Sequence, residues 1–186
     1  MMFNFEKAFK LTKPFFKAVG QNALFNNTTG PDNTAVGSHS LEANTTGSYN
    51  DALGANALKS NTSGGSNAGI GYNTLYYNTT GSDNVAVGRN ALHNNTGGNY
   101  NVAVGRSSLL ANTTGNSNNA FGYLSAENTT TGSNNISIGH ASLRTNTTGG
   151  NNVAIGHAAL GASTTASANT AVGYYALGTN TTGTAN

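Results

Sequence analysis

Apolar residues recur along this chain at intervals of 17 residues. From Lys17 to Asn186 the sequence divides into ten successive 17-residue units without an insertion, and we number the positions of each unit as columns 1 to 17, beginning with Lys17. Column 4 is Gly and column 17 is Asn in every unit. Column 3 is always apolar: Val19, Val36, Leu53, Ile70, Val87, Val104, Phe121, Ile138, Ile155 and Val172. A period kept this strictly predicts a solenoid, in which each unit forms one coil of a stack.

Each unit contains two short apolar stretches. In the unit from Val85 to Asn101, Val-Ala-Val precedes Gly88 and Ala-Leu follows it, and most units then continue with the turn sequence Asn-Thr-Thr-Gly. Neither stretch is long enough for a globular helix, whereas Gly and Asn-Thr-Thr-Gly are typical of turns between strands. The pattern predicts an all-β fold, a parallel β-solenoid or β-roll of ten coils with two short strands per coil. At a strand spacing of about 4.8 Å, such a stack is about 48 Å long.

A single coil offers few side chains for a core. Its sizeable apolar residues are the one in column 3 and the one in column 8, which is Leu in most units. A coil this thin buries little apolar surface, and packing several solenoids side by side turns lateral surface into core. The sequence therefore predicts a homo-oligomer.

Residues 1–16 form a separate N-terminal segment. Lysines spaced three or four residues apart, from Lys7 to Lys17, alternate with apolar residues, which predicts a short amphipathic helix over residues 2–12 that ends near Pro14. Lysines interrupt every apolar run and no Ala-x-Ala site follows, so the segment does not have the pattern of a signal peptide. We interpret it as a cap or connector within an assembly. Binding to a membrane surface is the alternative.

The two ends of the repeat suggest a contact between subunits. The last unit closes at Asn186 and offers apolar side chains on its open coil, and the N-terminal segment offers aromatic ones. Docking one onto the other gives a head-to-tail contact that propagates into a filament. Truncation of a longer chain is the competing explanation for the open coil. The candidate assembly contacts are Phe5, Phe9, Phe15, Phe16, Val172 and Leu177.

The composition restricts the class of protein. Only 8% of the residues are charged, the formal net charge is +2, and the chain has no Cys. A disordered chain has no reason to keep one column apolar in every unit, so the Asn, Gly and Thr content reflects a repeat. The lack of Cys excludes disulfides and thiolate metal sites. Four lysines at one end do not form a nucleic-acid footprint, and we expect neither nucleic-acid binding nor a stable membrane span.

Column 5 is the most varied polar column. It directly follows the turn Gly, so we expect its side chains to project outward as a candidate surface recognition ridge that binds a glycan or another surface. Ordinary solvated side chains or contacts between chains are the alternative. The ridge consists of Tyr72, Arg89, Arg106, Tyr123, His140, His157 and Tyr174.

No arrangement of residues predicts catalysis or a cofactor. His140 and His157 are one coil apart and suit a metal in principle, but no carboxylate or further His shares their column. Asp32 and Asp83 share a column, yet they are three coils apart, about 14 Å, which is too far for an acid/base pair. We therefore expect a protein that is not an enzyme and that carries neither a catalytic nor a metal site.

The invariant columns have structural interpretations. Gly in column 4 predicts a positive φ angle, or a position where a Cβ atom would collide with a neighbouring chain. The Asn and Thr columns predict ladders of hydrogen bonds between equivalent residues of successive coils. Several Asn-x-Thr/Ser sequences are also formal glycosylation sites, but the turn itself requires them. Examples are Asn44, Asn61, Asn78, Asn112 and Asn146.

Four segments carry a resemblance to a known family. Asn-Val-Ala-Val-Gly at 84–88 and 101–105, Asn-Ile-Ser-Ile-Gly at 135–139 and Asn-Val-Ala-Ile-Gly at 152–156 resemble the head repeats of trimeric autotransporter adhesins, which form trimeric left-handed parallel β-rolls. Phage tail-fibre repeats are similar. The resemblance spans residues 17–186, although the 17-residue period is longer than that of the adhesin heads. It implies a homotrimeric fibre or adhesive head, extracellular or displayed on a cell or virion surface.

Together these features predict a structural fibre or filament subunit. The alternative is a ligand-binding solenoid, which binds a glycan through column 5 or ice through the Thr column from Thr28 to Thr181. Ice binders usually need two ranks of Thr on one flat face. Adjacent residues of a strand point to opposite faces, so Thr28 and Thr29 are not expected to share one.

Overall fold

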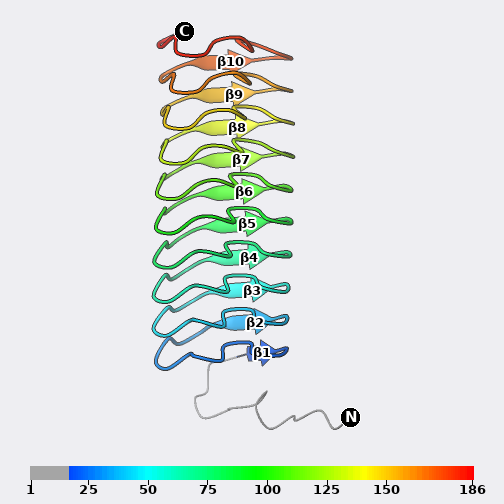
Figure 1. Cartoon of the computed structure of the whole chain (residues 1–186), viewed down its shortest axis with the longest axis vertical. Coiled ribbons are helices and arrows are strands. Elements are labelled where there is room, and N and C mark those ends of the chain that lie inside the picture. The colour runs from blue at the N-terminus through cyan, green and yellow to red at the C-terminus, as the bar shows by residue number, and fades with distance from the viewer. Residues whose placement is uncertain (1–16) are drawn as a thin grey trace.

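The computed structural model describes residues 17–186 as a parallel β-solenoid of ten stacked coils (Figure 1). One three-residue strand lies in each coil, and all ten strands form a single sheet in chain order. The strands are β1 (Lys17–Val19), β2 (Thr34–Val36), β3 (Asp51–Leu53), β4 (Ala68–Ile70), β5 (Val85–Val87), β6 (Val102–Val104), β7 (Asn119–Phe121), β8 (Ile136–Ile138), β9 (Val153–Ile155) and β10 (Thr170–Val172). The predicted all-β solenoid of 17-residue coils is confirmed. The helix expected over residues 2–12 and the N-terminal segment 1–16 lie outside the described residues.

The register places every residue beside its equivalent in the next coil. All neighbouring strands are parallel. For example, Val85 of β5 pairs with Val102 of β6, and Ala86 pairs with Ala103. The same register, without a shift, joins the other strand pairs of residues 17–186. Because the period never changes, a column of the sequence becomes a straight row of side chains along the stack.

The expected second strand in each coil is absent from residues 17–186. Columns 6 and 8 have positive φ angles in every coil, as in Asn90 (φ 58°) and Leu92 (φ 50°), and an extended strand does not permit such angles. The backbone there alternates between bonds within a coil and bonds to the next coil. Ala91 N–H donates to Gly88 O at 3.1 Å, while Leu92 N–H donates to Ser108 O at 3.0 Å. This segment is a series of turns, which the Ala-Leu pattern alone does not reveal.

The interior contains only one large apolar side chain per coil. Leu fills column 8 in nine coils, and Ala, Ser or, in one coil, Thr fills column 7. Column 2, the middle residue of each strand, is Ala in eight coils and faces inward. Column 3 lies on the opposite face of the strand, so its apolar side chain does not contribute to the core as the sequence suggested. Phe121 is 41% exposed and Ile138 is 39% exposed.

Buried Asn side chains occupy the rest of the interior. In column 17, Asn101 Nδ2 donates to Asn84 Oδ1 at 3.1 Å and to Gly115 O at 2.9 Å, and Asn101 N–H donates to the same Asn84 Oδ1 at 3.0 Å. The pattern repeats through the stack, for example between Asn152 and Asn135. Each amide is therefore bonded above and below, as a buried polar group requires. The predicted Asn ladder is confirmed.

The glycines of column 4 turn the chain at the end of each strand. Their φ angles lie between 117° and 138°, a region that L-residues rarely adopt. A Cβ atom on Gly105 would also lie 2.5 Å from Gly122 O in the next coil. The predicted positive φ angle is confirmed, whereas the close contact is with the next coil of the same chain and not with a neighbouring chain.

Candidate recognition surfaces

The outward face of the sheet carries a continuous row of apolar side chains in column 3. Alternate residues of a strand point to opposite sides, so columns 1 and 3 both face away from the core. We call these two columns the outer strand face. In four coils both columns are β-branched and apolar: Val85, Val87, Val102, Val104, Ile136, Ile138, Val153 and Ile155. Large apolar side chains in folded proteins are mostly buried, and an extended exposed patch is typical of an interaction site.

The outer strand face changes along the stack. Column 1 is polar in the first three coils, where it contains Lys17, Thr34 and Asp51, and again at Asn119 and Thr170. Column 3 is apolar in all ten coils. The widest apolar area therefore lies over β5, β6, β8 and β9, which Figure 1 places in the middle and upper part of the stack.

Column 5 forms a stacked row of side chains at the turn after each strand. Arg89 lies over the ring of Tyr72, with 5.8 Å between Cζ and the ring centroid, and Arg106 lies over Tyr123 at 5.6 Å. The ring of Tyr123 then stacks on His140, with centroids 5.4 Å apart. The row continues through His157, 4.8 Å from His140, to Tyr174 at 5.1 Å. All seven residues of the candidate ridge thus lie in one row, and their role in recognition stays a prediction.

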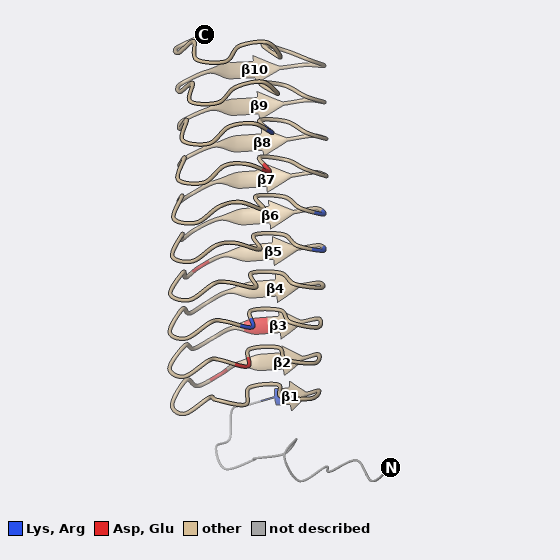
Figure 2. Ribbon diagram, viewed as in Figure 1, with Lys and Arg blue, Asp and Glu red and all other residues tan. Residues whose placement is uncertain are grey.

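Charged side chains are few, and four of the ten Lys, Arg, Asp and Glu residues within residues 17–186 form ion pairs. Arg144 Nε donates to Glu127 Oε2 at 2.8 Å, and Lys59 Nζ lies 3.7 Å from Glu42 Oε2. Figure 2 shows two neighbouring basic positions at the turns after β5 and β6, with no acidic residue drawn beside them. These positions are Arg89 and Arg106, the two basic residues of column 5.

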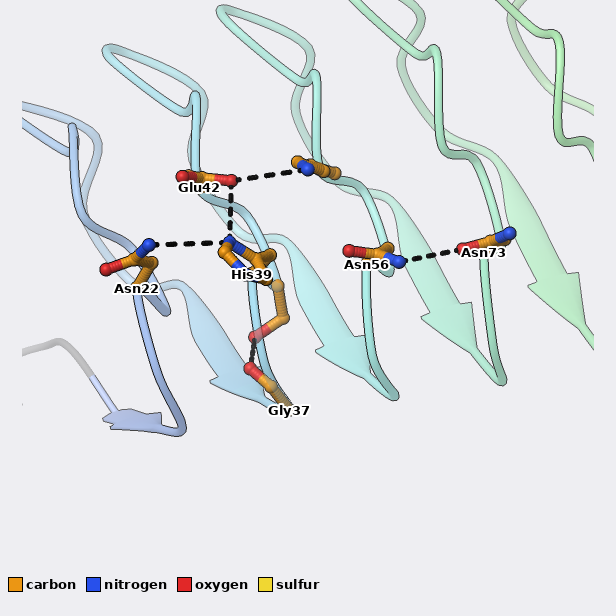
Figure 3. Close-up of polar contacts among 8 residues, drawn as sticks. Asn22, Gly37, His39, Glu42, Asn56 and Asn73 are labelled. Atoms are coloured by element: carbon orange, nitrogen blue, oxygen red, sulfur yellow. Dashed lines mark hydrogen bonds and ion pairs between the residues drawn. The ribbon is translucent and has the colours of Figure 1, made fainter. Parts of the chain in front are cut away.

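A polar network joins the first coils on the side that contains columns 6 and 9 (Figure 3). His39 Nδ1 lies 3.0 Å from Glu42 Oε2 and 3.4 Å from Asn22 Nδ2 of the preceding coil. Glu42 also contacts Lys59 of the following coil. Because these groups satisfy one another between coils, the network stabilises the stack and offers little to a ligand.

The Thr column forms a second ladder. In column 12, Thr96 Oγ1 donates to Thr113 O at 3.1 Å, and the same carbonyl accepts the backbone N–H of Thr96 at 2.9 Å. The predicted ladder is confirmed, with a backbone acceptor. Columns 12 and 13 lie outside the strands. The expectation that Thr28 and Thr29 point to opposite faces of a strand was therefore wrong, because these residues are not in a strand. The ice-binding hypothesis stays untested, and the column 12 hydroxyl hydrogens are already used between coils.

The remaining candidate positions fall into three groups. Val172 and Leu177 in the last coil are 66% and 37% exposed, while Phe5, Phe9, Phe15 and Phe16 lie outside the described residues. The formal glycosylation sites are buried and bonded in the column 11 ladder, for example Asn78. No cluster of three metal-ligating side chains occurs within residues 17–186, and the same residues include no helix of the length and hydropathy that a membrane crossing requires.

Comparisons with known proteins return no relative. No protein-family model, curated protein or solved structure matches the chain. The resemblance to adhesin heads and phage tail fibres therefore stays a prediction, which rests on the Asn-Val-Ala-Val-Gly segments and on the solenoid fold.

Proposed function

We propose that this chain is a non-enzymatic structural subunit of a fibre displayed on a cell or virion surface, and that it assembles through the outer strand face. The observation that supports the proposal is the outward position of the apolar column 3 side chains. In ten successive coils column 3 faces outward, while the core is built from Ala, Leu and Asn. A free chain in water leaves this face exposed, and a partner removes it from water.

The partner that fits this face best is a second copy of the chain. Side chains on the outer strand face repeat once per coil, about every 4.8 Å. A solenoid with the same rise interdigitates with that row along its whole length of about 48 Å, whereas a globular partner covers only part of it. Chains that share one direction and one repeat pack naturally around a rotation axis. The resemblance to adhesin heads favours three chains.

The proposed adhesive role concerns the surface that stays accessible to solvent after the chains assemble. The ridge of column 5 lies at the turn after the strand, beside the outer strand face and not on it. It therefore stays accessible when the strand faces of several chains meet. A fibre built in this way presents one ridge per chain to a host surface or glycan.

The test is the mass of the assembly after charges are placed on the outer strand face. We expect wild-type protein to have three times the mass of one chain, or a multiple of it, by size-exclusion chromatography with light scattering. The variant Val104→Lys with Ile138→Lys is expected to be monomeric, because two cations on an apolar interface cost several kcal/mol of desolvation. The two sites lie two coils apart, about 10 Å, so the new charges do not face each other directly.

The matched control is Thr114→Lys with Thr148→Lys, in the same two coils but in exposed column 13. It adds the same charge and should keep the wild-type mass. Circular dichroism checks that both variants retain β-structure. Monomeric wild-type protein at micromolar concentration, or equal masses for both variants, would contradict the proposal.

A further inference from the structure

The ridge contains two adjacent cations without an acidic partner. Arg89 and Arg106 occupy column 5 of successive coils, so their side chains start about 4.8 Å apart. Neither is in an ion pair, since the pairs within residues 17–186 involve only His39, Lys59 and Arg144 as bases. Columns 4 and 6 contain no Asp or Glu in any coil. Like charges opposite each other in a sheet repel, so this pair is stabilised by any anion that binds between them.

The positive charge of Arg89 and Arg106 does not reflect an excess of basic residues in the described part of the chain. Residues 17–186 contain five Lys or Arg (Lys17, Lys59, Arg89, Arg106 and Arg144) and five Asp or Glu (Asp32, Glu42, Asp51, Asp83 and Glu127), which gives a formal net charge of 5 − 5 = 0. The positive charge of the ridge is therefore local. Figure 2 shows the same separation, since the two basic turns after β5 and β6 lie at the opposite edge from the acidic positions that precede β2 and β5.

Aromatic rings hold the two guanidinium groups in place. The guanidinium of Arg89 lies over the ring of Tyr72, and that of Arg106 lies over the ring of Tyr123. No side-chain hydrogen bond within the described residues uses the N–H groups of either Arg, and both residues are exposed. The pair thus offers several oriented donors to one anionic group, the geometry that binds carboxylate, sulfate or phosphate.

Most ring faces of the row are covered by neighbouring rings, which disfavours recognition by stacking. Tyr123 and His140 stack with an interplanar angle of 23°, and His157 and Tyr174 with 22°. The rings from Tyr123 to His157 therefore cover one another along the row and present mainly their edges to a ligand. Single-stranded nucleic acids are bound largely by stacking bases on open aromatic faces, and neutral sugars also pack on such faces. A ligand held by this row must be held by charge and by hydrogen bonds to edges.

We propose that the ridge binds an anionic polysaccharide, with carboxylate or sulfate groups bridging Arg89 and Arg106. The polymer lies along the stack axis, because the row of polar edges continues from this pair past Tyr123 to His157. Successive acidic sugars of one chain then meet equivalent positions of successive coils. The inference rests on the proposed adhesive role for its biological setting, and the experiment measures binding and assembly separately.

The experiment compares binding of the full chain to heparin, polygalacturonate, dextran and single-stranded poly(dT) by calorimetry at several salt concentrations. We expect both acidic polysaccharides to bind and dextran not to bind. Arg89→Gln with Arg106→Gln should raise the Kd by at least about tenfold, which corresponds to about 1.4 kcal/mol. It should also reduce the slope of log K against log salt by about two, because two fewer cations release counterions.

The matched control is Lys59→Gln with Arg144→Gln, which removes two positive charges that are paired with Glu42 and Glu127. This variant should bind the acidic polysaccharides as the wild type does. Light scattering should give the same mass for all three proteins, so that a failure of assembly is distinguished from a failure of binding. The inference is overturned if both double variants lose affinity equally, if poly(dT) binds as tightly as the polysaccharides, or if the wild type binds neither acidic polymer.

Discussion

At the scale of single residues, the stack is controlled by columns in which one residue type repeats, and its weak points are the exceptions. The column 11 ladder runs from Asn27 to Asn112 with each Nδ2 donating to the preceding Oδ1, for example Asn112 to Asn95 at 2.8 Å. Thr129 then interrupts it. Asn112 Oδ1 is buried without a hydrogen bond, and across the interruption Asn146 Nδ2 makes a long contact of 3.4 Å to Thr129 Oγ1, beside its bond to Gly149 O at 3.0 Å. An interrupted ladder thus leaves a buried acceptor unpaired, which costs stability.

Restoring the ladder should stabilise the protein. In Thr129→Asn the new Nδ2 can donate to Asn112 Oδ1, and the new Oδ1 can accept from Asn146 Nδ2. We expect the free energy of unfolding to rise by about 1–3 kcal/mol, the cost of a buried unsatisfied group. Urea unfolding followed by circular dichroism measures this change. Thr131→Asn, on exposed column 13, is the control and should change stability by less than about 0.5 kcal/mol; a gain no larger than that of the control would contradict the ladder argument.

Two glycine columns should respond differently to the same methyl group. Gly105 in column 4 combines a φ angle of 130° with a close contact to Gly122 O. Gly132 in column 14 faces a similarly close carbonyl, but its φ angle is ordinary, and Ala166 already occupies this column. We expect Gly105→Ala to lower the free energy of unfolding by at least about 2 kcal/mol more than Gly132→Ala, since strain adds to the clash. Equal melting temperatures of the two variants would show that the backbone conformation is not the constraint.

At the scale of the coil, the sequence predicts some features and misses others. The period, the parallel register and the turn at column 4 follow from spacing, because an unbroken 17-residue repeat allows only one alignment of coils. The prediction of a second strand in each coil was wrong, because Leu92 adopts a left-handed backbone conformation that its residue type does not suggest. The sequence also did not predict that the column 3 side chains face outward. Alternation separates Ala103 from Val104, but it does not say which of the two faces inward.

The size of a coil explains which side chains form the core. A coil with one short strand and a series of tight turns has a narrow interior, and Ala in column 2 fits there beside one Leu. The row of column 5 could be predicted from its position after the turn Gly. Its stacking could not, because Tyr, Arg and His follow no simple pattern in the sequence, and only the zero-shift register brings Tyr123 and His140 together.

At the scale of the whole molecule, stability should be the sum of two kinds of contact. Contacts between coils are the same in every chain and do not depend on other molecules. Contacts through the outer strand face form only when chains associate, so their contribution depends on protein concentration. Leu143, which is fully buried within the coil, and Ile138, which is 39% exposed on the outer strand face, represent the two kinds.

Truncating these two side chains should therefore separate the core from the interface. Leu143→Ala removes a buried side chain within one chain, and we expect it to lower the free energy of unfolding by about 2–5 kcal/mol at every protein concentration. Ile138→Ala should have little effect in dilute solution, where the face is in water, and an increasing effect on the melting temperature as concentration rises and wild-type chains associate. Thermal unfolding between nanomolar and high micromolar concentration measures both. A concentration-independent effect of Ile138→Ala would mean that the outer strand face has no partner of its own kind, and the fibre would then need a different interface.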